Sequence, residues 1–265
     1  MDKATLIARY AEQDTDKIVL ARLLDRMQMG KQRNIPTSTA FLSDREQVLA
    51  QQLLAAAGFQ EAIFFGGCAG AERACCCYVP DYWEPEDYLP SEDGPICLIR
   101  ASFRADDGLT HRDLLGSLMG AGIKRETVGD LYLSETSCDL LVLREIAPYL
   151  MQNLELAGRA RLTLTQLSLD QIQRPAIKTE LIRDTVPSLR LDTVVASGFR
   201  LSRSRAAALI ESGKTSLNHL PCVKPDHTVD AGDTVTVRGF GKFDLATVGR
   251  ETKKGRIWIE LRRYL

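Results

Sequence analysis

The side chains best suited to chemistry gather near the carboxyl end of this 265-residue chain, where arginine, serine and lysine recur at close spacing. Two short helices are expected there, and Ser202 is placed to cap the second, over residues 203–211. Backbone N–H groups and the helix dipole favour phosphate at such an end, and arginine offers a planar fork that matches phosphate oxygens. The residues expected to form this anion-binding surface are Arg190, Arg200, Ser202, Arg203, Arg205, Lys214, Asn218, Arg238 and Lys242.

Several of these side chains also have a purely structural explanation. Arg190 lies two residues before Asp192 and could pair with it, and Arg203 with Arg205 could form an ordinary solvated face. Asp192 and Asp233 are expected to serve turns or caps instead of contacting a ligand. The sequence leaves these alternatives open.

A second motif near this surface resembles a nucleic-acid signature only in part. The run Arg238-Gly239-Phe240-Gly241 begins like the RNP1 motif, but Lys242 stands where an aromatic side chain would stack on a base. We interpret the run as a glycine-kinked strand end, with Phe240 and Phe243 at least as suited to the core as to a ligand.

Charge is divided unevenly along the chain. Residues 185–265 carry 14 Lys and Arg against 8 Asp and Glu, whereas residues 1–184 carry 20 and 27. A basic segment on an otherwise acidic protein favours nucleic-acid binding, because Lys and Arg displace counterions from phosphates. No apolar run approaches the roughly 20 residues that span a bilayer. We therefore expect a cytoplasmic protein with no membrane partner.

Residues 1–184 show no catalytic or metal-binding constellation. His111, Arg112 and Asp113 are adjacent at a helix start, where their side chains face different directions and form no proton relay. The seven cysteines include the consecutive Cys75–Cys77 but no CxxC pair. Neighbouring strand residues face opposite ways, so buried reduced thiols are favoured over a metal site or a reactive thiol. No catalytic residue, cofactor or metal is expected, and an RNA-modifying enzyme with an appended binding module is the alternative.

Hydrophobic patterning predicts the elements that hold these residues, and the fold class is α+β. Residues 3–29 are expected to form one amphipathic helix capped by Gly30, and Ser43 with Glu46 forms a capping box for a second helix that ends near Gly58. Strand-like stretches follow at 62–65 and 73–79. Residues 1–80 are thus predicted to be a helical α/β unit.

The middle of the chain predicts a ferredoxin-like (RRM-like) α+β sandwich. Its elements follow a proline-rich loop at 80–95 and alternate in the order strand, helix, strand, strand, helix, strand. Gly116 and Gly120, four apart in the first helix, are interpreted as a site of tight packing, less often of a ligand near the backbone. The predicted ranges are 96–103, 110–119, 129–133, 139–143, 146–156 and 160–169, with a linker over 170–186.

The C-terminal segment is similar to the S4 RNA-binding domain. That domain's pattern runs RLD, Gly, SR, LI, Gly, VN and GD, and only its Val is replaced here, by Leu217. The matching residues are Arg190-Leu191-Asp192, Gly198, Ser202-Arg203, Leu209-Ile210, Gly213, Leu217-Asn218 and Gly232-Asp233. The resemblance implies an αL-type RNA-binding module.

Residues 111–132, HRDLLGSLMGAGIKRETVGDLY, extend the resemblance to a particular group of proteins. With the S4 module they resemble the YlmH family of bacterial S4 proteins through the motif HRD-LG-LMG-GI-RE-GD. The resemblance implies an N-terminal α/β domain (1–80), an RNA-binding α+β domain (81–175) and an S4 domain (186–265). His111, Arg112, Lys124 and Arg125 form a second candidate RNA surface.

The YlmH resemblance also implies a role at the ribosome. Such proteins are linked to rescue or quality control of stalled large subunits that carry peptidyl-tRNA. The expected partners are therefore rRNA or tRNA and the large ribosomal subunit, and no DNA partner is expected.

Overall fold

The computed structural model describes residues 2–265, which divide into two compact units with the boundary between Pro175 and Ala176. The helices are α1 (Lys3–Tyr10), α2 (Asp14–Arg33), α3 (Asp44–Ala56), α4 (Pro85–Tyr88), α5 (His111–Gly120), α6 (Ala147–Asn153), α7 (Leu191–Gly198) and α8 (Arg203–Glu211). Short 3-10 turns are η1 (Ala105–Asp107), η2 (Arg125–Thr127), η3 (Arg144–Ile146) and η4 (Leu169–Gln171). Among residues 2–265, no helix has the length and apolar character needed to span a bilayer.

Within residues 2–265, the strands form four antiparallel sheets. Three of these lie in the first unit, with strand orders β1-β3-β2, β5-β6-β4-β9 and β7-β8, and the fourth, β10-β15-β14-β13-β11-β12, forms the second unit. The strands are β1 (Thr37–Leu42), β2 (Ala62–Phe65), β3 (Ala74–Tyr78), β4 (Ile96–Ser102), β5 (Val128–Leu133), β6 (Ser137–Leu143), β7 (Leu156–Ala157), β8 (Ala160–Arg161), β9 (Thr163–Leu167), β10 (Thr179–Val186), β11 (Thr215–Leu217), β12 (Leu220–Pro221), β13 (Thr234–Val237), β14 (Gly241–Glu251) and β15 (Ile257–Tyr264).

The single N-terminal helix predicted for residues 3–29 is wrong, because α1 ends at Tyr10 and α2 begins at Asp14. The carboxylate of Asp16 accepts hydrogen bonds from the backbone N–H groups of Glu12 (3.0 Å) and Gln13 (2.9 Å), which starts a new helix. Arg45 of α3 donates to the same carboxylate at 2.7 Å. The predicted cap at Gly30 is also wrong, since α2 continues to Arg33.

The small sheet explains the three consecutive cysteines. Cys75 and Cys77 face a core shared with β4 and β6, whereas the Cys76 thiol meets the sulfur of Met27 on α2 at 3.6 Å. All three are buried and free. Burial raises the pKa of Cys76 to about 12 and that of Cys138 to about 12. These thiols therefore pack as protonated apolar groups near neutral pH.

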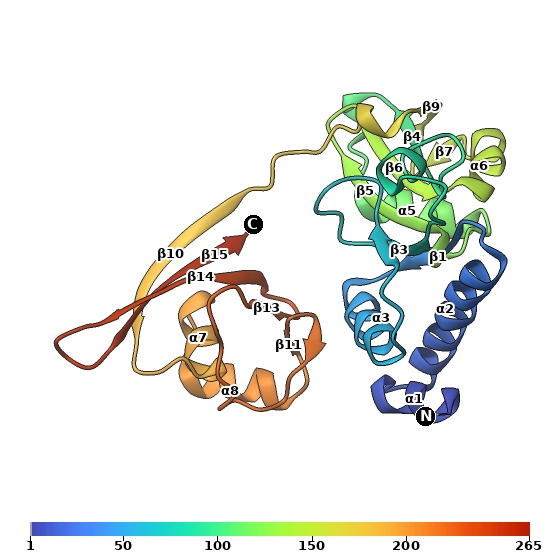
Figure 1. Cartoon of the computed structure of the whole chain (residues 1–265). Coiled ribbons are helices and arrows are strands. Elements are labelled where there is room, and N and C mark those ends of the chain that lie inside the picture. Colours follow the sequence, from blue (N-terminus) through green and yellow to red (C-terminus); the bar gives the residue numbers. More distant parts are fainter. Residues whose placement is uncertain (1) are drawn as a thin grey trace. The chain divides into compact units, whose positions relative to one another are not determined.

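The middle of the chain has the predicted ferredoxin-like topology. The element order β4-α5-β5-β6-α6-β9 and the sheet order β5-β6-β4-β9 are those of a split βαβ sandwich. Figure 1 shows α5 and α6 beside this sheet and the β1-β3 sheet below it. The predicted second helix is shorter than expected, because Leu156–Ala157 leaves it to form β7.

Both faces of the four-stranded sheet are covered. Cys97 and Ile99 of β4 pack with Leu114 and Leu118 of α5, whereas Leu98 of β4 packs with the β1 and β3 side chains. A strand buried on both faces reads as a continuous apolar run, which is how β4 appears in the sequence. Residues 1–80 and 81–175 thus share one core, and their division into separate domains stays a prediction.

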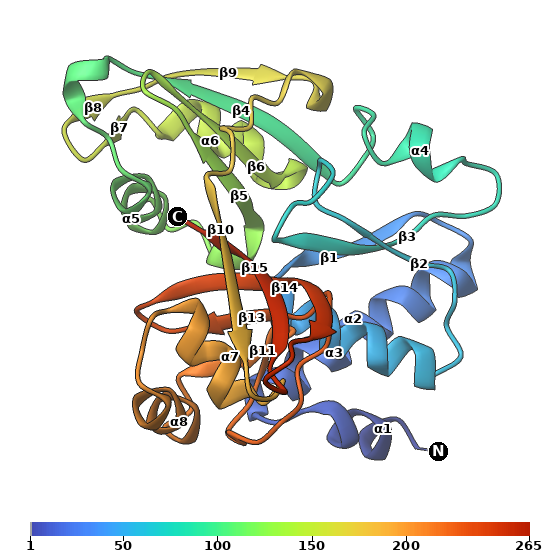
Figure 2. The same ribbon diagram turned by 90° about the vertical axis from the view of Figure 1, so that its left-hand side faces the viewer.

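The second unit packs α7 and α8 against one face of its six-stranded sheet (Figure 2). The core between them includes Val194 and Ile210 from the helices and Val235, Phe243 and Ile259 from the strands. Each of these five side chains is fully buried. The helix pair is therefore fixed on a rigid support.

The linker predicted for residues 170–186 is wrong over its second half. Strand β10 pairs with β15 along its whole length, from Thr179 opposite Tyr264 to Val186 opposite Ile257. Its mixed charges fit an edge strand whose side chains are mostly exposed or half-buried. The C-terminal unit consequently begins at Ala176, well before the predicted position 186.

Candidate RNA-binding surface

The turn between α7 and α8 has the capped geometry that the sequence predicts. The Ser202 hydroxyl accepts a hydrogen bond from the Arg205 backbone N–H at 3.3 Å, which begins α8. Arg200, in the preceding turn, has a φ of 54°, a left-handed conformation that is uncommon for residues other than glycine. Its side chain is 76% exposed and lies 3.5 Å from the Glu180 carboxylate.

Arg190 and Arg203 converge on one buried carboxylate. Asp192 is 4% exposed, and both guanidinium groups approach its Oδ2 at 3.1 Å. The Thr193 hydroxyl donates to its other oxygen at 3.0 Å. Burial alone would raise the pKa of Asp192, but the hydrogen bonds from Arg190, Arg203 and Thr193 hold it below its ordinary value. The ionised Asp192 carboxylate therefore orients the side chains of Arg190 and Arg203.

Both arginines remain available to a ligand despite this ion pair. The Arg190 side chain is 39% exposed and the Arg203 side chain is 54% exposed. Two cations over one anion leave a net positive charge at the surface. Because Arg has five N–H donors, a guanidinium can pair with a carboxylate and still donate to a phosphate.

Arg205 lies on a different side of α8 from Arg203, because residues two apart on a helix do not face each other. Its guanidinium carbon is 5.6 Å from the centre of the Phe240 ring. Phe240 packs in turn on Phe199, with ring centres 5.9 Å apart, and is half-buried. Phe243 is fully buried, so of the two phenylalanines Phe240 alone reaches the surface.

Lys214 and Arg238 lie together near the other end of α8. The Arg238 backbone N–H donates to the Lys214 carbonyl at 2.8 Å, and both side chains are exposed. Lys242 lies further along β14, with its ammonium group 4.9 Å from the centre of the Tyr264 ring. The predicted cations are therefore spread over α8, the turns beside it and β14 instead of surrounding one helix end.

Asn218 is engaged inside the unit. Its amide nitrogen donates to Asp233 at 2.7 Å, and its amide oxygen accepts from the Thr234 backbone N–H at 3.0 Å. Its φ of 48° places it in a tight turn. These contacts explain an asparagine here structurally, so its predicted RNA contact is not needed to account for the residue.

The second candidate surface is not one cluster. His111 and Arg112 are exposed at the start of α5, whereas Lys124 and Arg125 follow its end, and a ten-residue helix is about 15 Å long. Arg125 is half-buried and donates to the backbone carbonyls of Val128 and Gly129. It therefore stabilises the turn before β5, and Lys124 alone of that pair is exposed.

The middle sheet is unsuited to the way that RRM domains bind RNA. Those domains stack bases on aromatic side chains of an open sheet face. Here the face opposite α5 and α6 is covered by the β1-β3-β2 sheet. The interpretation of Gly116 and Gly120 as tight-packing sites is also wrong, because a Cβ at either position would meet nothing within 4 Å.

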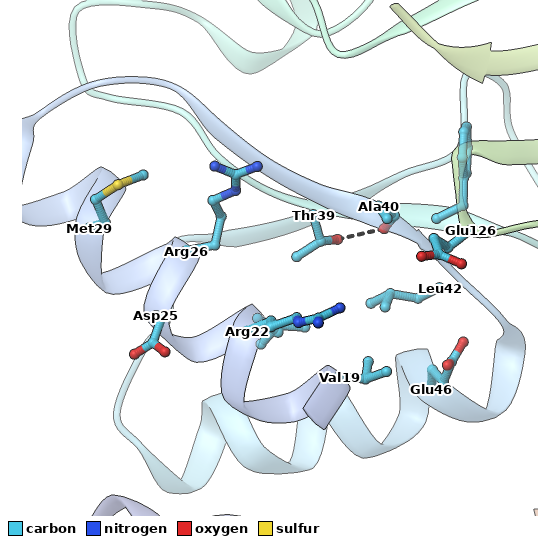
Figure 3. A pocket seen from close by; sticks show the side chains of 12 residues that line it. Val19, Arg22, Asp25, Arg26, Met29, Thr39, Ala40, Leu42, Glu46 and Glu126 are labelled. Carbon is cyan, nitrogen blue, oxygen red and sulfur yellow. Dashed lines mark hydrogen bonds between the residues drawn. The ribbon is translucent and has the colours of Figure 1, made fainter. Parts of the chain in front are cut away.

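A cavity of about 670 Å³ lies between α2, β1 and α3 in the first unit (Figure 3). Arg22, Arg26 and Glu126 line it together with apolar side chains. The Glu46 carboxylate at its edge already accepts from the Ser43 hydroxyl at 2.7 Å, and Arg26 Nε donates to the Ser38 carbonyl at 3.0 Å. Within residues 2–265, no group of three or more His, Cys, Asp or Glu could hold a metal ion.

Sequence reasoning did not single out four cations at the tip of the β14–β15 hairpin. They are Arg250, Lys253, Lys254 and Arg256. The available signal was the run Thr252-Lys253-Lys254-Gly255, in which glycine stands where a hairpin needs a left-handed residue. Charge alone does not show that this run lies at the tip of a hairpin.

Comparisons with known proteins find two family domains in the chain and a similar protein of known name. The family model of the candidate RNA-binding domain in YlmH matches residues 103–171, and that of the S4 domain matches residues 189–235. A Bacillus subtilis (strain 168) protein named ribosome-associated protein quality control protein P2 is 35% identical over 227 residues, covering 85% of this chain and 86% of that protein. The solved structure of cell division protein ylmH from Streptococcus pneumoniae aligns at 20% identity with a TM-score of 0.49, covering 62% of this chain and 98% of that chain.

Proposed function

The chain belongs to the YlmH family of S4-domain proteins, and on that premise we propose that it binds ribosomal RNA or tRNA and acts in quality control of stalled large ribosomal subunits. Its B. subtilis relative is named a ribosome-associated protein quality control protein. The role assigned here is that of a cytoplasmic RNA-binding protein, with no catalysis of its own and with neither DNA nor a membrane as partner.

The observation that carries this proposal is the pair of arginines on Asp192. Arg190 and Arg203 are held 3.1 Å from a buried carboxylate yet stay partly exposed. Such a pair is preorganised, so little side-chain freedom is lost when a phosphate binds. Arg200 lies in the turn before α8, Arg205 lies on another side of α8, and Lys214 with Arg238 lies near the other end of that helix.

The unusual backbone of Arg200 supports the same assignment. A left-handed turn residue is normally glycine, and an arginine there costs conformational energy of roughly 1 kcal/mol. Its side chain is 76% exposed. A cation held in that position makes sense if it contacts a ligand at the start of α8.

The test is substitution of Arg203→Gln together with Arg205→Gln in the full chain. Glutamine is preferable to glutamate, because a carboxylate at position 203 would lie against the ionised Asp192. We expect affinity for purified large-subunit rRNA to fall at least tenfold, with a log–log salt slope shallower by roughly 1.5. The free energy of unfolding should fall by only about 1 kcal/mol, because Arg190 and Thr193 still donate hydrogen bonds to Asp192.

The matched control is Arg22→Gln with Arg33→Gln, which removes two exposed arginines from α2. It should bind rRNA and co-sediment with large subunits as the unchanged chain does. If the Arg203 and Arg205 variant co-sedimented with large subunits as the unchanged chain does, the surface along α8 would not be the RNA-binding surface. Mass analysis of rRNA after incubation with the protein should show no modification, and a new mass would favour the enzyme alternative.

A further inference from the structure

The hairpin that joins β14 to β15 is strongly basic. Residues 249–256 read GRETKKGR, with four cations and one acid, and residues 250–256 are all exposed. Figure 1 shows the two strands continuing beyond α7 and α8 to this hairpin, which projects from the unit. The tip is therefore a positive patch separate from the surface along α8.

The tip is a fixed turn. The Gly255 N–H donates to the Thr252 carbonyl at 2.9 Å, and the Thr252 N–H donates to the Arg256 carbonyl at 2.7 Å. Gly255 has a φ of +71°, which L side chains rarely adopt. This is the arrangement of a three-residue hairpin loop with a glycine bulge. Lys253 and Lys254 are the two middle residues of the turn that the Gly255-to-Thr252 hydrogen bond closes.

The base of the hairpin is also anchored. Arg256 donates from Nε to the Thr185 hydroxyl of β10 at 3.0 Å and from Nη2 to the Thr185 carbonyl. Trp258 packs on Gly249, where a Cβ would lie 2.6 Å from the indole. Among residues 2–265, no hydrogen bond or ion pair engages the side chains of Arg250, Lys253 or Lys254. These three cations are left for a ligand.

The chemistry of the tip favours phosphates held in a base-paired helix. Proteins that recognise unpaired nucleotides stack bases on aromatic side chains, whereas double-stranded RNA is recognised by shape and backbone contacts. Residues 250–256 contain no aromatic side chain, and the neighbouring Trp258 is half-buried on Gly249. None of the large exposed apolar residues lies in this segment, so it offers nothing to insert into a membrane.

We propose that the β14–β15 tip is a second RNA contact, in which Arg250, Lys253 and Lys254 bind the phosphate backbone of base-paired ribosomal RNA. This rests on the proposed function, and it adds a contact that neither family model covers, because the S4 match ends at residue 235. The RNA is then held at two places on one rigid unit, along α8 and at the tip of the sheet on which α8 packs.

The experiment compares the full chain with an Arg250→Gln, Lys253→Gln, Lys254→Gln variant. Binding to purified large-subunit rRNA, bulk tRNA, a short RNA duplex and its single strand is measured at several salt concentrations. We expect affinity of the variant for rRNA and for the duplex to fall roughly 10- to 100-fold, with a log–log salt slope shallower by roughly 2.5. Binding to the single strand should change much less.

A charge-matched control removes three exposed cations of α2 by Lys17→Gln, Arg22→Gln and Arg33→Gln. This control should leave affinity and salt slope unchanged, which separates a local contact from the effect of net charge. The turn is held by backbone hydrogen bonds and glycine, so the hairpin variant should melt at the same temperature as the unchanged chain.

The outcomes separate the two proposals. If the hairpin variant binds rRNA like the unchanged chain while the Arg203 and Arg205 variant does not, the tip is not a contact and the proposed function stands. A loss confined to tRNA or to the single strand also overturns the assignment to base-paired rRNA. Loss of binding to anionic phospholipid vesicles with unchanged rRNA binding would overturn it in favour of a membrane. If the unchanged chain binds no RNA, both proposals fail.

Discussion

At the scale of single residues, the second unit holds two arginines, Arg190 and Arg203, against one buried carboxylate, that of Asp192. Arg190, Arg203 and Asp192 were each identifiable from the S4 pattern, and pairing of Arg190 with Asp192 was an open alternative. That Arg203 joins the same carboxylate depends on how α7 packs against α8, which no local pattern specifies. The two helices thus turn separate charges into one oriented pair.

Asp192→Asn tests whether this carboxylate orients the pair. The variant should lose about 2 kcal/mol of unfolding free energy at pH 7, because a buried charged acceptor of four hydrogen bonds, from Arg190, Arg203 and Thr193, is replaced by a neutral amide. It should also bind rRNA more weakly, since Arg190 and Arg203 lose their common anchor. Chemical denaturation and rRNA binding, each measured from pH 3 to pH 7, provide the check.

The pH dependence follows from the direction of the shift. Folding lowers the pKa of Asp192, so its stabilisation is fully present above the unfolded value of about 3.9 and is lost as pH falls through the folded pKa. The difference in unfolding free energy between the unchanged chain and the Asp192→Asn variant should therefore narrow below pH 4. Glu211→Gln, at an exposed position on α8, is the control, and its unfolding free energy should show no such difference from that of the unchanged chain. If the loss of unfolding free energy in Asp192→Asn were constant with pH, its cause would be changed packing and not the lost charge.

At the scale of elements, local signals were reliable where one residue determines the structure. The Ser43 capping box and the strands β4, β5 and β6 lie where predicted, whereas residues 160–169, predicted as one strand, form β8 and β9 in different sheets. The break between α1 and α2 falls in residues 11–17, AEQDTDK, which have no large apolar side chain, and the capping carboxylate of Asp16 is held from α3 by Arg45. The start of α2 therefore depends on a residue distant in sequence, which the apolar periodicity does not reveal.

Glycines in helices give a contrasting pair of predictions at this scale. Gly30→Ala should destabilise the fold by about 2 kcal/mol, because the new Cβ would lie 2.3 Å from Thr37 Oγ1 and 3.2 Å from the Ile35 carbonyl. Gly116→Ala should instead stabilise it by up to about 1 kcal/mol, since nothing lies within 4 Å. Urea denaturation of both variants provides the measurement. A stabilising Gly30→Ala would contradict the packing of α2 on β1 and β3.

At the scale of the whole molecule, charge and fold divide the chain in a similar way. Residues 1–184 are net acidic and residues 185–265 are net basic, and the second compact unit begins at Ala176. The S4 motif could be predicted because it consists of turns and caps close together in sequence. Strand β10 could not, because an edge strand with exposed charged residues resembles a linker until its partner β15 is known.

Fragments of the chain test whether β10 is part of the RNA-binding unit. A fragment of residues 176–265 should melt cooperatively and keep most of the salt-dependent rRNA binding, because it holds the whole six-stranded sheet with α7 and α8. A fragment of residues 187–265 should be much less stable and should aggregate. It leaves the β15 edge unpaired, deprives Arg256 of Thr185, and removes the Asp184 acceptor of the Ser197 hydroxyl. Equal melting temperatures for the two fragments would mean that β10 is dispensable and that the unit begins after residue 186, as the sequence alone suggested.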